Sequence, residues 1–157
     1  MVGCGQSEKI EQKEPTEIQL TKENFDEYII LNVNIKDFEI DYSTGLFTSY
    51  EYTGIANLEV EARLKKDVKV NNVKISGRIS TTGKCWAMKN FDFSLQLDKN
   101  GEGDISNQIT TGDSSLLKPD RPTLFKFYNY SPSGNEFLIN DDEVLITSLE
   151  GTVTVLD

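Results

Sequence analysis

The chain has 157 residues, a net charge of −10 and no histidine. A chain of 157 residues is typical of one domain with one hydrophobic core, and an excess of 26 acidic over 16 basic residues argues against nucleic-acid binding, which needs a clustered Lys/Arg surface. Without histidine, the chain cannot form a Ser-His-Asp or Cys-His nucleophile or a histidine-ligated metal site, and its two cysteines cannot supply a thiolate metal cluster.

The first sixteen residues differ in composition from the rest of the chain. Val2-Gly3-Cys4-Gly5 is followed by a charged segment, residues 6–16, in which Ile10 is the one large apolar residue. Such a segment cannot bury enough apolar surface to fold. We therefore predict a disordered polar tether over residues 1–16 and a single domain over residues 17–157.

The Val-Gly-Cys-Gly motif resembles the lipobox of bacterial lipoproteins. The resemblance implies that the thiol of Cys4 carries the lipid, that a signal peptide is cut just before it, and that the protein is anchored to the outer face of the bacterial cell membrane. The basic and apolar regions of a signal peptide do not precede the motif, so we expect Met1 to lie inside the original apolar region. The alternative is that Cys4 is an ordinary thiol in a disordered tail.

Residues 18–28 predict one short helix, Thr21–Tyr28. Thr21 is a favourable N-cap residue, and Phe25 and Tyr28 share one helical face at a spacing of three. The segment also resembles an I-x-L-T-x-x-N-F-x-x-Y signature of small extracytoplasmic proteins of Gram-positive bacteria, often lipoproteins of unassigned function. This resemblance implies no catalytic residue.

From Ile29 onward, apolar residues alternate with polar ones, as in strands buried on one face. The alternation changes phase near Lys36-Asp37, which predicts a β-bulge or a switch between sheets there. It changes phase again at Asn71-Asn72. Separate strands are predicted over residues 47–53 and 56–64. The inward side chains of the second strand are Ala56, Leu58, Val60, Ala62 and Leu64.

Residues 144–156 also read as a strand, with Leu145, Leu149, Val153 and Val155 in phase. Unbroken, this strand would be about 43 Å long, at roughly 3.3 Å per residue, which exceeds the strands of a small sandwich. We therefore predict a bend or bulge at Glu150-Gly151. A further strand is predicted over residues 124–130.

Residues 91–109 read as a β-hairpin. Phe91, Phe93, Leu95 and Leu97 alternate with polar residues, and Asn100-Gly101 is the strongest short hairpin signal because both turn residues take positive φ. With seven to nine strands and frequent turns, the pattern predicts an all-β fold, an antiparallel β-sandwich of immunoglobulin-like type with one short N-terminal helix. The Cys-Trp-Cys core of antibody domains is absent, so the immunoglobulin-like topology rests on analogy.

The turn of this hairpin also carries part of a calcium-loop pattern. Asp98, Asn100, Glu102, Gly103 and Asp104 match its first, third, fifth, sixth and seventh positions. The twelfth position, which should be a bidentate glutamate, is Ile109, and strands rather than helices flank the loop. A polar hairpin tip is therefore the preferred interpretation, and we predict no metal site and no cofactor.

Two tyrosine pairs, Tyr50 with Tyr52 and Tyr128 with Tyr130, each share one face of a predicted strand. Tyrosine offers a rigid ring with a polar tip, so such a pair can stack on a sugar or anchor a protein partner. The alternative is a structural role at the edge of the sandwich.

Two other features contain side chains that could take part in chemistry. Cys85, beside Trp86, could be a reactive thiol, but no cationic cluster accompanies it and a buried, inert thiol is the better interpretation. The carboxylates of Asp26-Glu27 and of residues 141–143 could serve acid–base hydrolysis of a glycan, although adjacent carboxylates near strand ends are usually solvated.

Taken together, these observations predict a non-enzymatic cell-envelope lipoprotein with no catalytic residues. Its β-sandwich would bind a protein or glycan, or act as a spacer. The alternatives are a calcium-dependent adhesion module that uses the Asp98–Asp104 loop, and a carboxylate-based hydrolase of glycans or peptides.

Overall fold

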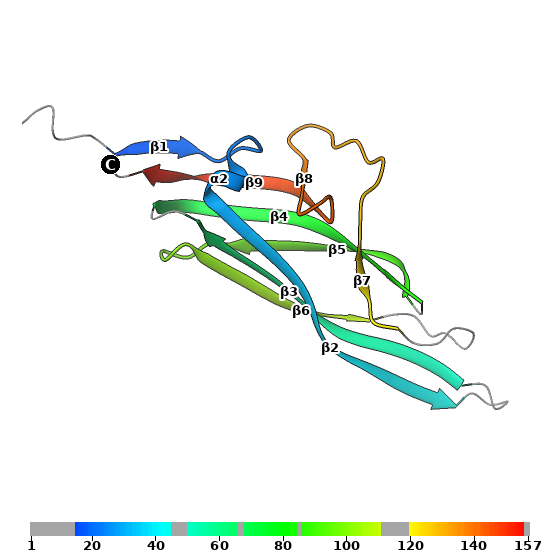
Figure 1. Cartoon of the computed structure of the whole chain (residues 1–157). Coiled ribbons are helices and arrows are strands. Elements are labelled where there is room, and N and C mark those ends of the chain that lie inside the picture. The colour runs from blue at the N-terminus through cyan, green and yellow to red at the C-terminus, as the bar shows by residue number, and fades with distance from the viewer. Residues whose placement is uncertain (1–14, 45–49, 66–67, 85, 111–119, 156–157) are drawn as a thin grey trace, which may run out of the picture.

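The computed structural model describes residues 15–44, 50–65, 68–84, 86–110 and 120–155. This part of the chain contains nine strands and one four-residue helix (Figure 1). In chain order they are β1 (Thr16–Gln19), α2 (Phe25–Tyr28), β2 (Ile29–Thr44), β3 (Tyr50–Leu64), β4 (Lys69–Gly83), β5 (Trp86–Gln96), β6 (Glu102–Thr110), β7 (Thr123–Phe125), β8 (Phe137–Ile139) and β9 (Val144–Val155).

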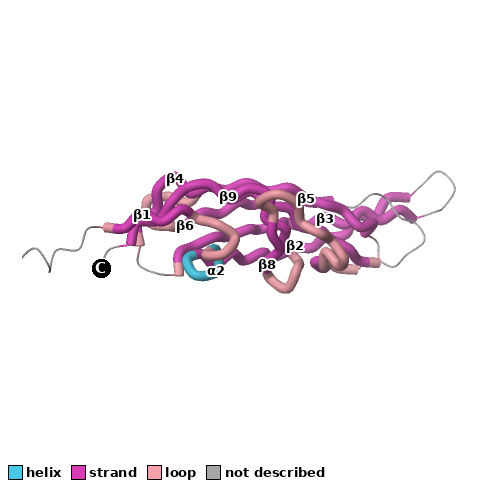
Figure 2. The backbone as a smooth tube through the Cα atoms, turned by 90° about the horizontal axis from the view of Figure 1, so that it is seen from above, coloured by secondary structure: helices cyan, strands magenta, loops and turns pink. Residues whose placement is uncertain are grey.

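The strands form two antiparallel sheets that pack against each other. The six-stranded sheet has the order β1-β9-β4-β5, with β7 paired to β4 and β8 paired to β9, and the three-stranded sheet has the order β2-β3-β6. Seen from above (Figure 2), β4 and β9 run along one side of the molecule, and β2 and α2 along the other. The prediction of a two-sheet antiparallel β fold is confirmed, whereas its immunoglobulin-like topology stays a prediction.

The core lies between the two sheets. The inward side chains of β3 alternate as predicted, and Ala56, Leu58, Val60 and Ala62 are each no more than 2% exposed. Opposite them, Val73, Ile75 and Ile79 of β4 are fully buried. Each fully buried aliphatic side chain contributes roughly 1.5–3 kcal/mol by leaving water. This inter-sheet packing is the main stabilising term of the fold.

The predicted helix is shorter than expected, and Thr21 is not its N-cap. The backbone N–H of Thr21 instead donates to Asn24 Oδ1 (2.8 Å), so residues 21–24 form a turn and the helix begins at Phe25. Asn24 Nδ2 also donates to the carbonyl of Gln19 (2.9 Å), which ties the turn to β1. A single helical turn has little stability of its own, so burial of Phe25 and Tyr28 holds it in place.

Strand β1 was not predicted, and it begins at Thr16, inside the predicted tether. Its hydrogen-bonding partner is β9 at the far end of the chain, with Thr16 opposite Val155 and Gln19 opposite Thr152. Only Ile18 among its four residues is large and apolar, so the local alternation is too weak to reveal it. Residues 16–19 therefore form a strand because they pair with β9, and not because of their own sequence pattern.

All three predicted irregularities are present. The register of β2 against β3 shifts between Lys36 and Glu39, and Asp37 has a φ of 55°. The register of β4 against β9 shifts between Asn71 and Lys74, where Gly151 has a φ of 103°. A side chain at Gly151 would lie 2.5 Å from the carbonyl oxygen of Asn72, so only glycine fits there.

The predicted phase of β9 is wrong at Leu145. A second shift pairs Gly77 with Ile146 and Ser76 with Ser148, which leaves one extra residue in β9 and reverses its faces. Leu145 therefore pairs with Arg78 and lies on the outer face of the six-stranded sheet, although it is fully buried. Part of the chain must cover that outer face.

Strand β3 is continuous from Tyr50 to Leu64, which corrects the prediction of two strands. Gly54 interrupts its apolar pattern without ending it. A Cβ atom at Gly54 would lie 3.2 Å from two ring atoms of Trp86, so the missing side chain leaves room for the buried indole. The indole Nε1 donates to the carbonyl of Asp120 (3.1 Å).

The predicted hairpin over residues 91–109 is also wrong. β5 pairs with β4 and β6 pairs with β3, so the two strands belong to different sheets. The turn itself forms, with the N–H of Gly101 donating to the carbonyl of Asp98 (2.9 Å), and Gly101 has a φ of 79° whereas Asn100 is not among the positive-φ residues. The Asn-Gly pair determines a tight reversal, but it does not determine which strands pair.

The strand predicted over residues 124–130 is limited to β7. After Phe125 the chain leaves the sheet, and Asn129 takes a φ of 57°, which a regular strand does not allow. Residues 126–136 form turns outside the sheet. They lie toward the end of the molecule opposite the C-terminus (Figure 1).

The register of β5 can be tested by two neighbouring substitutions. Leu95 is 5% exposed in the core, so Leu95→Ala should lower the free energy of unfolding by about 2–5 kcal/mol through lost burial and an unfilled cavity. Gln96 is exposed on the other face, and Gln96→Ala should stay within roughly 0.5 kcal/mol. Urea midpoints at constant m-value measure both. Equal losses would contradict this register.

Candidate functional site

A groove lies on the outer face of the six-stranded sheet, between the sheet and the segment that follows β7. It has a volume of about 290 Å³. It combines polar side chains from β4 and β5 with aromatic side chains from residues 125–130. Its lining comprises Arg78, Ser80, Met88, Asn90, Phe125, Phe127, Tyr128, Asn129, Tyr130 and Leu145. We call this the tyrosine groove.

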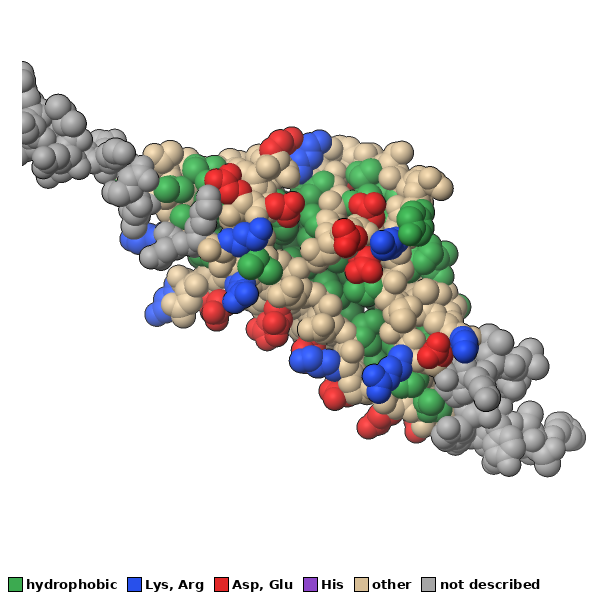
Figure 3. Space-filling model, viewed as in Figure 1, with side chains coloured by type: hydrophobic (Ala, Val, Ile, Leu, Met, Phe, Trp, Pro, Cys, Tyr) green, Lys and Arg blue, Asp and Glu red, His purple; other side chains and the backbone are tan. Residues whose placement is uncertain are grey.

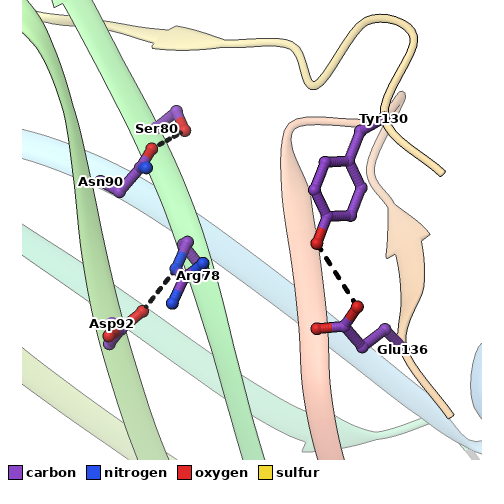
Figure 4. A network of polar contacts seen from close by, with 6 residues as sticks. All are labelled: Arg78, Ser80, Asn90, Asp92, Tyr130 and Glu136. Atoms are coloured by element: carbon purple, nitrogen blue, oxygen red, sulfur yellow. Dashed lines mark hydrogen bonds and ion pairs between the residues drawn. The ribbon is translucent and has the colours of Figure 1, made fainter. Parts of the chain in front are cut away.

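The floor of the tyrosine groove is built by cross-strand pairs between β4 and β5. Arg78 lies opposite Asp92, and its Nε donates to Asp92 Oδ1 (2.8 Å). Ser80 lies opposite Asn90, and its hydroxyl donates to Asn90 Oδ1. Figure 4 shows the two pairs side by side along the strands. The strand period of two brings them to one face, because successive side chains alternate between faces.

The wall of the groove carries apolar surface exposed to solvent. Tyr128 is 70% exposed, Met88 is 62% exposed and Tyr130 is 40% exposed. Among the described residues, these are the three exposed large hydrophobic side chains, and all three line this groove. Phe127 packs edge-on against Tyr130, with ring centroids 5.9 Å apart at an angle of 65°. That contact orients the Tyr130 ring.

Glu136 holds the turn that carries Tyr130. Its Oε1 accepts hydrogen bonds from the backbone N–H of Ser133 (3.1 Å), the hydroxyl of Ser133 (3.2 Å) and the hydroxyl of Tyr130 (3.4 Å, Figure 4). The Ser133 backbone bond is the largest of the effects that hold the pKa of Glu136 below its ordinary value, and Arg78 adds a smaller one. Glu136 is therefore a carboxylate at neutral pH.

The charge of Arg78 is also compensated. The hydrogen bond to Asp92 and the charge of Asp92 raise the pKa of Arg78, with smaller contributions from Tyr130 and Glu136. The guanidinium of Arg78 is thus paired with one carboxylate, that of Asp92, and Glu136 adds a weaker, longer-range effect. Arg78 is the one charged side chain among the residues that line the groove, and its charge is partly compensated by Asp92.

The aromatic segment is attached to the rest of the fold by an unusual turn between β8 and β9. Asn140, Asp141 and Asp142 have φ values of 52°, 57° and 66°. Each left-handed residue other than glycine costs about 1–2 kcal/mol, although Asn and Asp tolerate the conformation best. The carbonyl of Asp142 accepts the N–H of Phe127 (2.9 Å), and Asn140 Nδ2 donates to the carbonyl of Leu31 (2.8 Å) in β2. The groove wall is thereby held in place by both sheets.

The predicted calcium loop lies in a different hollow, of about 550 Å³, over the three-stranded sheet. Asp98, Glu102 and Asp104 line it together with Arg63, and the remaining lining residues are Asn32, Glu61, Ala62 and Gly103. The carboxylate of Asp98 is already engaged, since its Oδ1 accepts the N–H groups of Asn100 (2.8 Å) and Glu102 (3.1 Å). No group of three or more carboxylate, thiol or imidazole side chains that could hold a metal occurs in the described part of the chain.

The other candidate residues divide into two groups. Cys4, Cys85 and the side chains of Tyr50 and Tyr52 lie outside the described residues. The carboxylate pairs are at exposed positions: Asp26-Glu27 in α2 and Asp141-Asp142 in the β8–β9 turn. On the face seen in Figure 3, Lys and Arg side chains are interspersed with Asp and Glu rather than gathered in one patch.

Sequence reasoning identified Tyr128 and Tyr130 as a candidate pair but missed the polar floor beneath them. Arg78, Ser80 and Asn90 look like ordinary outward residues of half-buried strands. Only the register of β4 against β5 brings them together, and no local motif encodes that register. Met88 was also missed, because a single exposed methionine has no characteristic spacing.

No family model, curated protein or solved structure matches this chain. In the described part of the chain, no helix has the length and apolar composition needed to cross a membrane. The geometry of the chain itself must therefore support any functional assignment.

The carboxylate of Glu136 gives the turn a pH dependence. Because its pKa is lowered in the folded state, its stabilising contribution is present above the unfolded-state pKa and is lost as the pH falls through the folded-state pKa. Glu136→Gln should therefore lower Tm at neutral pH, and the difference should shrink toward zero below the folded-state pKa. Thermal unfolding of both proteins across a series of acid pH values measures this difference in Tm.

Ser133→Ala serves as the companion variant. It removes one of the three hydrogen bonds to Glu136 and should raise the pKa of Glu136, as read from its side-chain carboxyl NMR signal. A Glu136→Gln difference in Tm that stays constant through acid pH would contradict the assignment.

Proposed function

We propose that the protein is a non-enzymatic, envelope-tethered binding module. Lipid on Cys4 anchors it to the outer face of the bacterial cell membrane, and its β-sandwich, of immunoglobulin-like type, binds an extracytoplasmic protein or glycan through the tyrosine groove. The observation that carries the proposal is the convergence of Met88, Tyr128 and Tyr130 on one groove. Exposed apolar side chains scattered singly are ordinary, but a group of them marks an interaction surface.

The composition of the groove supports binding rather than catalysis. Aromatic residues, methionine and arginine are enriched where proteins contact ligands, and the groove contains all of them. Arg78 is held by Asp92, and Glu136 is held by Ser133 and Tyr130, so these groups orient side chains. A nucleophile–base pair would need a reactive hydroxyl or thiol beside a proton acceptor. Ser80 lies instead against the amide oxygen of Asn90, which is a poor proton acceptor.

The position of the groove suits a tethered protein. β1 begins at Thr16 beside the C-terminal end of β9, whereas the β7–β8 segment lies toward the other end of the molecule (Figure 1). Eleven residues lie between Cys4 and Thr16, so the chain from one to the other spans at most about 43 Å when extended. An anchor at Cys4 would therefore hold one end of the sandwich near the membrane and leave the groove toward the outside.

The lipid anchor is tested with protein expressed in a Gram-positive host behind a lipoprotein leader. We expect an intact mass that carries a diacylglycerol group on Cys4 and partition into the detergent phase, because several acyl chains suffice for stable anchoring where one is marginal. Cys4→Ala is the matched control and should remain unmodified. A freely soluble wild-type protein with an intact Cys4 thiol would refute the anchor.

The binding role is tested by sedimentation of the unacylated chain with purified Gram-positive cell envelopes. Tyr128 is exposed and makes no core contact, so Tyr128→Ala should weaken binding at least about tenfold, as for removal of a central aromatic anchor. Gln96→Ala, exposed on the same sheet face outside the groove, is the control and should bind as the wild type does. Equal binding by Tyr128→Ala and wild type would refute the tyrosine groove as the contact surface.

A further inference from the structure

We infer that the tyrosine groove binds an uncharged pyranose residue of a glycan. The inference rests on the proposed function and narrows its ligand class. It depends on four properties of the groove: its charge balance, its hydrogen-bonding groups, its apolar surface and size, and the strand pairing of the backbone beneath it.

The charge balance favours a neutral ligand. Arg78, the cation of the groove floor, is paired with Asp92 at 2.8 Å and lies in the field of Glu136. An anionic ligand would have to compete with Asp92 for the guanidinium of Arg78. A cationic ligand would find no carboxylate among the residues that line the groove. Electrostatic complementarity between partners therefore points to a ligand without net charge.

The hydrogen-bonding groups of the floor suit hydroxyl groups. A hydroxyl both donates and accepts, and so does each of Ser80 and Asn90. Ser80 is 1% exposed and donates to Asn90 Oδ1. The Asn90 amide NH₂ group makes no hydrogen bond within the described part of the chain, so it is available to a ligand. A sugar that presents neighbouring hydroxyls can bond to Asn90 Nδ2 and to the guanidinium N–H groups of Arg78 other than the Nε–H that Asp92 accepts.

The apolar surface and the size of the groove complete the match. A pyranose ring has C–H groups on its faces, which pack on an aromatic ring while its hydroxyls point outward. Tyr128 and Tyr130 supply such rings above the polar floor, with exposures of 70% and 40%. At about 290 Å³ the groove is at the small end of the range of roughly 300–1,000 Å³ for ligand pockets. It therefore accommodates one residue of a longer chain.

The backbone beneath the groove disfavours an extended peptide. Peptides that add to a sheet need an open strand edge with free N–H and C=O groups. At the groove, β4 is paired on both sides, with Ser80 opposite Asn90 in β5 and opposite Phe125 in β7. β5 is the last strand in the order of its sheet, and it contributes the side chains of Met88 and Asn90 to the groove lining. A ligand rich in hydroxyl groups uses them better than a peptide backbone does.

The test is an NMR titration of the full, unacylated chain with neutral oligosaccharides, using maltohexaose, cellohexaose, xylohexaose and chitohexaose. At least one should shift the amide or side-chain signals of Ser80, Asn90, Tyr128 and Tyr130. Tyr128→Ala and Asn90→Ala should each raise the Kd of that sugar at least about tenfold, whereas Gln96→Ala should leave it unchanged. Thermal unfolding of the two groove variants at the same Tm as the wild type confirms that they fold.

Three results would overturn the inference: no shift with any of the four sugars, shifts outside the groove, or shifts that survive both groove substitutions. A proline-rich peptide and polygalacturonate are titrated in parallel. If either one occupies the groove and the sugars do not, the neutral-glycan assignment is wrong while envelope binding through the groove stands. If Tyr128→Ala also keeps full envelope binding, the proposed function fails separately.

Discussion

The register of β4 against its neighbours is the constraint on which both the core and the groove depend. β4 pairs with β5 along one edge and with β9 and β7 along the other. Its inward residues Val73, Ile75 and Ile79 fill the space between the sheets, and its outward residues form the groove floor. Because side chains alternate with a period of two, a slip of one residue would exchange these two sets. Hydrophobic burial therefore also determines where the polar pairs lie.

Bulges adjust this register locally and change which side chains lie on the outer face of the sheet. The extra residue in β9 between its pairings with Ser76 and Gly77 turns Leu145 from the core face to the outer face. There Leu145 is fully buried and lines the tyrosine groove. The apolar side chain on an otherwise polar face gives the segment after β7 a surface to pack on. The bulge in β9 thus places Leu145 on the surface that the aromatic segment after β7 covers.

The wall depends on contacts that reach across the molecule. Three consecutive left-handed residues, 140–142, are unfavourable in isolation. They are retained because Asn140 bonds to Leu31 in the three-stranded sheet and Asp142 bonds to Phe127 in the wall. Such a connection restrains the segment that carries the tyrosines. For the proposed binding role, preorganisation of this kind would reduce the entropy cost of binding.

Local chemistry in the sequence determined much of this fold. Alternation identified the inward faces of β3 and β5, breaks in the alternation located the irregularities at Asp37 and Asn72, and the length of the last strand located the one at Gly151. These features depend on residues near one another in the chain, where the strand period acts directly. The same local pattern identified Tyr128 and Tyr130 as a candidate binding pair, although it placed them on a strand that ends at Phe125.

Only the tertiary structure decided which strands pair and which side chains meet. The Asn100-Gly101 turn joins two sheets rather than two paired strands, because burial of Leu95 and Ile109 between the sheets outweighs the local preference for a hairpin. β1 exists through its pairing with β9, more than 130 residues away, where the side chain of Gln19 also bonds to Gly151. The groove combines β4, β5 and residues 125–130. No local pattern encodes such contacts, since they arise from the free energy of packing the whole chain.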